Sequence, residues 1–155
     1  MLQLTREQFE CIIEQGRAGK PLEICGLLAG EIHPPIEGGD VAITRVECVY
    51  PVESDDKSPL TYTLNSTEYL RALKEIKARD LEVVGIYHTH PATEAYPSKT
   101  DVARAHWGDT DDLLFPEYSY LIVSLRDPQN PEPHSYKIRG RNIPDDIVEE
   151  PVAVV

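Results

Sequence analysis

Cysteine is scarce in this sequence, and the few cysteines present are not spaced as zinc ligands. The 155 residues contain three cysteines, Cys11, Cys25 and Cys48, with no CxxC pair among them. An odd number at this spacing predicts neither a disulfide framework nor a zinc site built from cysteines. A reducing cytoplasm is the compartment that this usage favours.

The sequence also has no long apolar run, and its basic residues are fewer than its acidic ones. No stretch reaches the roughly 18 apolar residues of a membrane span, and MLQLTREQFE is charged where a secretion signal needs an apolar segment. Lys and Arg total 15 against 27 Asp and Glu, a formal net charge of −12. An acidic surface repels phosphate backbones. The sequence therefore predicts no membrane span and no nucleic-acid partner.

Helical and strand patterns alternate along the chain. Capping residues and apolar periodicity predict helices over residues 5–17, 65–79 and 98–107. Apolar or alternating runs between turn residues predict strands over residues 22–29, 41–52, 61–64, 81–90, 118–125 and 133–141. Helices interspersed with buried strands indicate an α/β (α+β) sandwich, not a bundle or an all-β barrel. We predict one domain over residues 1–140 and an irregular acidic tail over residues 141–155.

The stretch YHTHPATEAYPSKTD, residues 87–101, holds two of the chain's five histidines. Side chains alternate along a strand, so His88 and His90 project to the same face, with Cα atoms about 7 Å apart. Asp101, in the first turn of the next helix, can add a carboxylate. Two imidazoles and one carboxylate leave a fourth tetrahedral position for water, as in catalytic zinc sites. Ser98 and Asp101 also fit a simple helix cap.

Other metal sites use similar residues. HExxH and the zinc deaminase pattern are both absent. A cupin pairs HxH with a Glu about four residues on, which His88, His90 and Glu94 fit, but the flanking glycines are missing and no later histidine is placed to complete the pattern. Two histidines and a carboxylate also suit non-haem iron. From these residues alone, zinc and iron both remain open.

The whole string, H-x-H, seven residues, then S-x-x-D, resembles the JAMM motif of MPN-domain metalloproteases. Upstream, PLEICGLLAG resembles the family's glutamate-bearing strand, E-x-C-G-L-L-x-G, with Glu23 in the glutamate position. The likeness covers about residues 5–140. It implies an MPN fold, similar to that of cytidine deaminases, with a mixed, mainly antiparallel sheet flanked by helices in a three-layer-like sandwich.

The resemblance also implies roles for particular residues. His88, His90 and Asp101 would hold one Zn²⁺, with metal-bound water as nucleophile. Glu23 would act as general base and then as proton donor to the leaving amine. Ser98 would help stabilise the oxyanion. The implied reaction is zinc-dependent hydrolysis of a peptide or isopeptide bond.

Family members of this kind cleave after the C-terminal tail of ubiquitin-fold proteins. The compact chain looks more like the short prokaryotic members, which are associated with ubiquitin-like sulfur carriers, and this is the expected partner and substrate. A non-catalytic MPN scaffold is the alternative, although such modules typically lose one or more ligands. A DNA-repair relative would carry HNHPSG where this chain reads HTHPAT.

Overall fold

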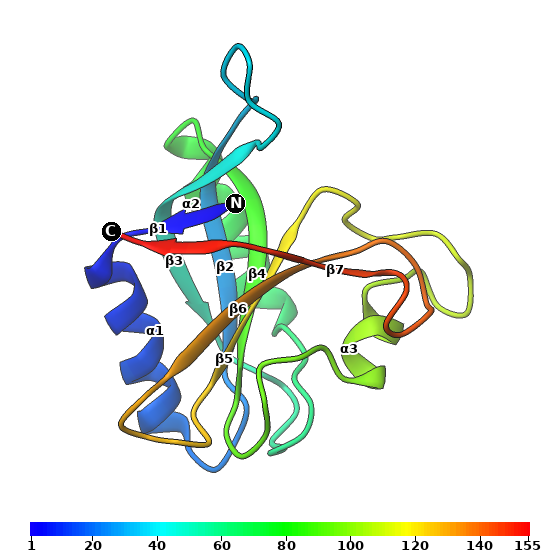
Figure 1. The fold of residues 1–155 in the computed structure, drawn as a ribbon. Coiled ribbons are helices and arrows are strands. Elements are labelled where there is room, and N and C mark those ends of the chain that lie inside the picture. The colour runs from blue at the N-terminus through cyan, green and yellow to red at the C-terminus, as the bar shows by residue number, and fades with distance from the viewer.

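One eight-stranded mixed sheet forms the centre of the protein in a computed structural model of residues 1–155 (Figure 1). The strands lie in the order β7-β6-β5-β4-β2-β3-β1-β8. Their bounds are β1 Leu2–Leu4, β2 Cys25–His33, β3 Ile43–Val52, β4 Glu82–His90, β5 Ser119–Ser124, β6 Glu132–Ile138, β7 Ile147–Glu150 and β8 Val152–Val154. Four neighbouring pairs are antiparallel, and β1 with β3, β1 with β8 and β4 with β5 are parallel.

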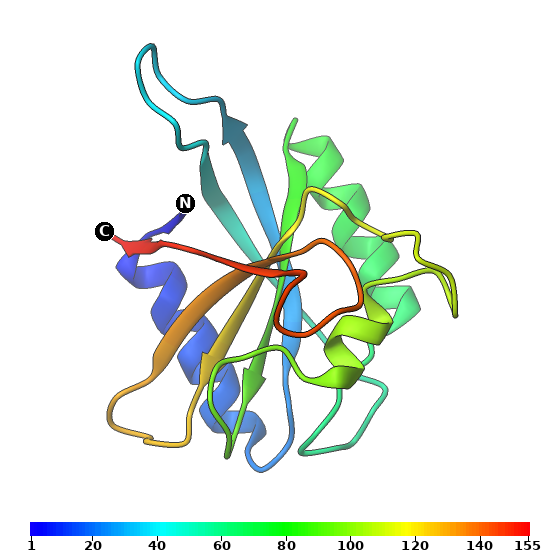
Figure 2. The same cartoon turned by 45° about the vertical axis from the view of Figure 1, so that its right-hand side comes forward.

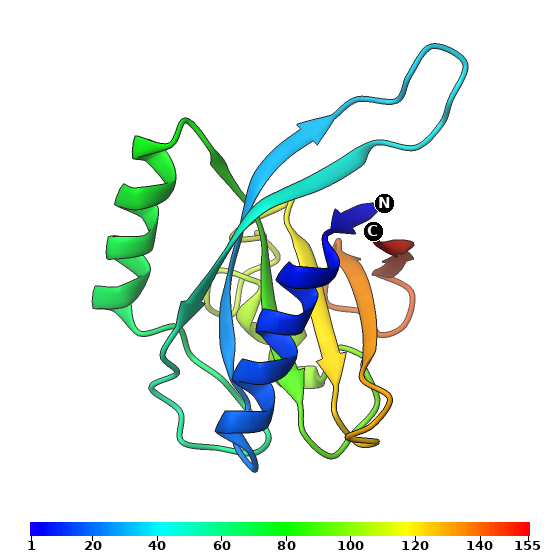
Figure 3. The same cartoon turned by 90° about the vertical axis from the view of Figure 1, so that its left-hand side faces the viewer.

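Helices cover both faces of this sheet, as predicted. Helix α1 (Arg6–Gly19) packs on one face, and α2 (Ser66–Ala78) lies on the other, followed in the chain by α3 (Lys99–Arg104) (Figure 3). All three begin at the capping residues seen in the sequence, Thr5, Asn65 and Ser98. The longest has 14 residues, and no helix is long and apolar enough to cross a bilayer. The α+β sandwich prediction is confirmed.

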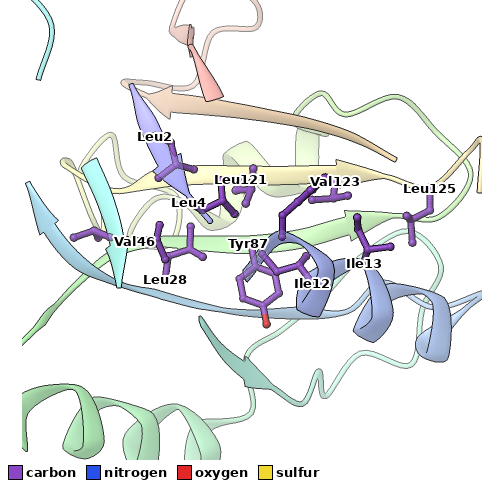
Figure 4. Packing of buried hydrophobic residues seen from close by; sticks show 12 residues of the cluster. Leu2, Leu4, Ile12, Ile13, Leu28, Val46, Tyr87, Leu121, Val123 and Leu125 are labelled. Carbon is purple, nitrogen blue, oxygen red and sulfur yellow. The ribbon is translucent and has the colours of Figure 1, made fainter. Parts of the chain in front are cut away.

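Strand β2 carries both halves of the core. Leu28 packs with α1 residues such as Ile12, whereas Leu27 packs with Ile76 of α2. Tyr87 of β4 lies fully buried in the first cluster (Figure 4). A Cβ on Gly26 would come within 2.3 Å of the Tyr87 hydroxyl oxygen. The glycine of the ExCG string is therefore required by this close approach.

Some strand predictions differ from the structure. Strand β2 begins at Cys25, not at residue 22, and runs on to His33. Residues 61–64 form no strand, only an isolated bridge between Ser54 and Leu64. β1 was not predicted, because three residues are too short a stretch for an alternation pattern to stand out.

The prediction of an irregular tail over residues 141–155 was wrong. β7 pairs with β6, and β8 pairs with β1, so the last residues run from one end of the strand order to the other (Figure 2). Glu150, in this acidic tail, is buried. It accepts a hydrogen bond from the Ser135 hydroxyl at 2.8 Å and lies 3.3 Å from the N-terminal ammonium. The acidic composition of the tail gave no apolar pattern for either strand, and the partner of β8 lies at the other end of the chain.

Removing residues 151–155 is expected to lower the free energy of unfolding by about 4 kcal/mol. The deletion uncovers Leu2 and Leu4, which are 0% and 1% exposed, and each buried leucine contributes roughly 1.5–3 kcal/mol. Urea denaturation followed by circular dichroism measures the change. Ile36→Ser, at a position 82% exposed, is the control and should leave stability unchanged. Equal midpoints for the deletion and the intact chain would contradict this role of β8.

Candidate metal centre

Three side chains of ligand type converge at the end of β4. His88 Nε2 lies 3.0 Å from His90 Nε2, and Asp101 Oδ2 lies 3.2 Å and 3.3 Å from those two nitrogens. All three residues are buried. The structure thus brings together the two histidines and the aspartate that the sequence singled out.

Local structure explains this convergence. His88 and His90 share a face of β4, while Tyr87 and Thr89 turn towards the α1 side. There Tyr87 joins the core, and the Thr89 hydroxyl oxygen accepts a hydrogen bond from the Ile24 N–H just before β2. After the intervening loop, Ser98 caps α3, and its hydroxyl oxygen accepts a hydrogen bond from the Asp101 N–H at 3.0 Å. Asp101 Oδ2 in turn accepts from the Ser98 N–H at 2.9 Å. The capping box therefore turns the Asp101 carboxylate towards the histidines.

The triangle of ligand atoms fits a tetrahedral metal ion. Ligands at 2.0–2.1 Å from zinc are separated by roughly 3.3–3.4 Å at tetrahedral angles, close to the three separations observed here. Two imidazole nitrogens that face each other at 3.0 Å cannot both present lone pairs without repulsion unless a cation or proton lies between them. His88, His90 and Asp101 are therefore suited to hold a divalent ion.

The charges in the cluster support the same arrangement. Burial disfavours the charged form of Asp101, but the neighbouring His88 and His90, with the Ser98 N–H, hold the pKa of Asp101 well below its usual range. Burial disfavours charged His90 as well, yet Asp101 and the Glu94 carbonyl raise the pKa of His90 above its usual value. The site thus stabilises positive charge beside an ionised carboxylate.

Glu23 reaches this cluster through the pairing of β2 with β4. Cys25 lies opposite His88 in the antiparallel ladder, so Glu23, two residues earlier, comes opposite His90. Its Oε1 is 3.9 Å from His90 Nε2, the side chain is buried, and Oε2 has no hydrogen-bond partner. Burial, followed by the nearby Asp101 charge, raises the pKa of Glu23 to about 8.

Glu23 and Asp101 are two possible third ligands beside the histidines. Ligand atoms of Glu23, His88 and His90 all lie within 4.8 Å of one another, so this trio could also hold a metal ion. The Asp101 separations, at 3.2 Å and 3.3 Å, are shorter than the 3.9 Å from Glu23 to His90. The shorter set matches direct coordination, and the longer distance places the Glu23 carboxylate beside that set.

Glu94, the carboxylate that a cupin would use, does not join the cluster. Its side chain is exposed, and only its backbone carbonyl oxygen approaches the site, 2.7 Å from His90 Nδ1. Any residue could supply that carbonyl. A backbone acceptor on the distal ring nitrogen orients a metal-binding imidazole, so Glu94 supports His90 without being a ligand.

Two contacts around the site were not foreseen from the sequence. The Tyr62 ring stacks on the His88 ring, with centroids 4.4 Å apart. Arg104 holds the loop that carries Tyr62, because its guanidinium donates to Asp56 Oδ2 at 2.8 Å and also to the Tyr62 carbonyl oxygen. Only the folded chain brings residues 56, 62 and 104 together, so sequence spacing gave no signal for them.

Two other residues with reactive side chains, Cys25 and His106, are buried. Cys25 is fully buried, and burial raises the pKa of its thiol to about 12, which makes it an unreactive core residue and not a nucleophile. His106 is also buried, with Nδ1 2.7 Å from the Val102 carbonyl oxygen. The helix ends earlier than predicted, and the chain after it folds inward.

The site contains two imidazoles, an ionised carboxylate and a second, protonatable carboxyl group beside them. This set of groups is typical of metal-dependent hydrolases. Comparison with known proteins gives the particular family. The chain belongs to the prokaryotic JAB family, since the family model described as prokaryotic homologs of the JAB domain matches residues 5–139. The resemblance to JAMM/MPN-domain proteins is confirmed, and the family is metal-dependent.

Named relatives are similar over most of their length. The whole chain is 37% identical to the CysO-cysteine peptidase of Mycobacterium tuberculosis and covers 92% of it. It is 32% identical to a desampylase of Haloferax volcanii over 128 residues, 79% of this chain and 80% of the relative. A solution structure from Desulfitobacterium hafniense matches all of this chain and 93% of that one, with a TM-score of 0.77 and 34% identity. The two named relatives are hydrolases.

Proposed function

We propose that this protein is a zinc peptidase that hydrolyses the amide bond after the C-terminal tail of a ubiquitin-like sulfur-carrier protein. The observation that carries the proposal is the buried Glu23 carboxyl group, placed 3.9 Å from a histidine of a complete ligand triangle. A structural metal site needs no such unpartnered carboxyl group beside it. The names of the relatives, CysO-cysteine peptidase and desampylase, support the substrate class.

In this proposal His88, His90 and Asp101 are the ligands of one zinc ion. When bound, zinc polarises the scissile carbonyl and lowers the pKa of a water molecule towards neutrality. Glu23 accepts the proton of the attacking water on its carboxylate and delivers it to the leaving amine. A pKa of about 8 in the metal-free site falls when a cation is near, towards a range in which the carboxylate both takes up and releases a proton.

Ser98 is proposed to act on the substrate oxygen. Its hydroxyl oxygen already accepts from the Asp101 N–H, which leaves the hydroxyl hydrogen free to donate. That hydrogen can stabilise the negative charge that develops on the carbonyl oxygen during attack.

Ser98→Ala is expected to lower kcat about 100-fold, as for the loss of one oxyanion donor. Steady-state kinetics measures this loss, and thermal unfolding separates it from the cost of the missing helix cap, about 1 kcal/mol. Asn65→Ala removes the corresponding cap of α2 and is the matched control, with similar destabilisation but normal kcat. If both variants lose activity equally, Ser98 only caps the helix.

The substrate assignment is tested with a ubiquitin-fold carrier whose C-terminal Gly-Gly is extended by one cysteine. Zinc-loaded protein should release the cysteine, and mass spectrometry of the carrier detects the loss. Metal analysis of protein purified without added zinc is expected to give one zinc per chain. Stoichiometric iron would overturn the zinc assignment, and intact carrier adducts after prolonged incubation would favour a non-catalytic scaffold.

A further inference from the structure

Arg104 has an unused pair of hydrogen-bond donors beside the metal centre. All of its hydrogen bonds, to Asp56 Oδ2, the Tyr62 carbonyl oxygen and Thr63 Oγ1, are made by Nη1. Nε and Nη2 have no partner within the chain, and 46% of the side chain is exposed. These two nitrogens form the fork with which a guanidinium binds both oxygens of a carboxylate. Arg104 can therefore bind a carboxylate from outside without releasing the loop that it holds.

Helix α3 places this guanidinium close to the groups that react in the proposed mechanism. Asp101 and Arg104 are three residues apart on one face of α3, and both line a hollow of about 300 Å³. Arg104 also contacts Asp56 at 2.8 Å, and Asp56 lines a second hollow of about 370 Å³, which contains Glu23. Burial raises the pKa of Glu23 to about 8, and the Arg104 charge acts against this rise. The guanidinium is thus within electrostatic range of the general base.

Arg104 is also the one cation of these two hollows that can accept a further partner. The other cation that lines them is Lys57, and its ammonium is paired with Glu53 at 2.9 Å. The remaining charged side chains of the two linings are all carboxylates, namely Glu23, Glu53, Asp56, Glu68 and Asp101. A carboxylate on a ligand would be repelled by these groups. It would therefore be held only at the open fork of Arg104.

A carboxylate beside a scissile amide bond identifies a C-terminal residue. In the last residue of a chain, only the Cα atom separates the amide nitrogen from the free carboxylate. In an isopeptide bond to a lysine side chain, the nitrogen is attached to an apolar stem instead. The hollow shared by Asp101 and Arg104 is at the lower end of ligand pockets, which begin at roughly 300 Å³, and most of its lining is apolar, with Leu64, Tyr69 and Phe115 among it. It suits one uncharged residue.

We propose that Arg104 binds the α-carboxylate of the residue that is released, so that the protein removes a single C-terminal residue with an uncharged side chain from its carrier. This inference rests on the proposed function and identifies its leaving group. Binding of the carboxylate would orient the leaving amine towards Glu23, which delivers the proton. Adducts that end in a free carboxylate would therefore be cleaved in preference to isopeptides.

The test compares carriers that differ only in the group after Gly-Gly. One ends in cysteine, the second ends in cysteine amide, which has nearly the same shape without the charge, and the third is joined to the Nε atom of a lysine. The zinc-loaded protein should cleave the acid with a kcat/KM about 30-fold above that for the amide, since a hydrogen bond to a charged group contributes roughly 10- to 100-fold. The isopeptide should be cleaved as slowly as the amide.

Arg104→Lys separates carboxylate binding from the holding of the Tyr62 loop. Lysine keeps the positive charge beside Asp56 but has no planar fork, so the ratio of acid to amide should fall to about 3. Arg141→Lys is the matched control, because the Arg141 guanidinium also holds a loop, through the carbonyl oxygens of Gly108 and Thr110. Its ratio should stay at about 30.

Calorimetry with the metal-free protein, which leaves the carriers intact, gives a second readout. The acid should bind about tenfold more tightly than the amide, and Arg104→Lys alone should lose this difference.

The outcomes distinguish the two proposals. If the zinc-loaded protein cleaves none of the three adducts, the proposed function fails. If it cleaves acid and amide equally well, the proposed function stands and the carboxylate site is wrong. If Arg104→Lys slows both reactions by the same factor, Arg104 only holds the Tyr62 loop, and the carboxylate site is again wrong.

Discussion

Glu23→Gln is expected to lower kcat/KM for amide hydrolysis about a thousandfold. This factor lies within the range that a positioned general acid–base group contributes. Glutamine has nearly the same shape as glutamate but cannot take up or release the proton. Because Glu23 is not in the closest set of ligand atoms, metal content should stay at one ion per chain. Progress curves with the carrier substrate and metal analysis of the same sample measure both quantities.

Glu53→Gln provides the matched control, since Glu53 lines the same hollow as Glu23 and its side chain is 62% exposed. It should retain activity within about twofold, as expected of a surface change. The metal-free proteins offer a second readout. The pKa of Glu23 is raised by burial to about 8, so Glu23 destabilises the fold increasingly as pH rises from about 4.5 to 8. Metal-free Glu23→Gln should lack this decline. Full activity in Glu23→Gln would remove Glu23 from the mechanism.

His90→Gln is expected to abolish both metal binding and hydrolysis, leaving less than about a thousandth of the activity. The ion would keep only two of its three protein ligands, and the contact between His90 Nδ1 and the Glu94 carbonyl would be lost as well. Metal analysis after dialysis and steady-state kinetics check the two losses. A chelator should inactivate the unaltered protein in the same way, and added zinc should restore it.

His134→Gln is the control for that substitution. His134 lies on β6, is 42% exposed and contacts Glu149, so its loss should affect neither metal content nor rate. Added zinc should also raise the unfolding temperature of the unaltered protein and not that of His90→Gln, because an ion that binds only the folded state stabilises it. Zinc that binds stoichiometrically to His90→Gln would contradict the ligand set.

Local signals were sufficient for most of the scaffold. Thr5, Asn65 and Ser98 start the three helices where the capping patterns predicted, and the alternation on β4 placed two imidazoles on one face. These predictions succeed because a cap or an alternation involves residues only a few positions apart. The ligand triangle could be anticipated for the same reason, since it comes from one strand end and the next helix start.

The features that could not be predicted from the residues alone depend on contacts between residues far apart in the sequence. Glu23 was singled out only through the likeness to a known family, because its position depends on the β2–β4 register. The stacking of Tyr62, a loop residue, on His88 of β4 depends on Arg104 of α3. Strand β8 was missed for the same reason, because its partner β1 lies at the other end of the chain. Glu150 is buried by Ser135 and by the first residue of the chain, neither of which is near it in the sequence.

Because the pairing between β2 and β4 holds the site together, activity should be lost together with the fold. The carboxyl group and the histidines that it serves are not joined by any short loop, so only intact hydrogen bonding between the two central strands holds them together. Slippage by one residue would turn Glu23 to the opposite face. Central strands open only with the whole domain, so heat inactivation and cooperative unfolding should share one midpoint, and no fragment lacking either strand should retain partial activity.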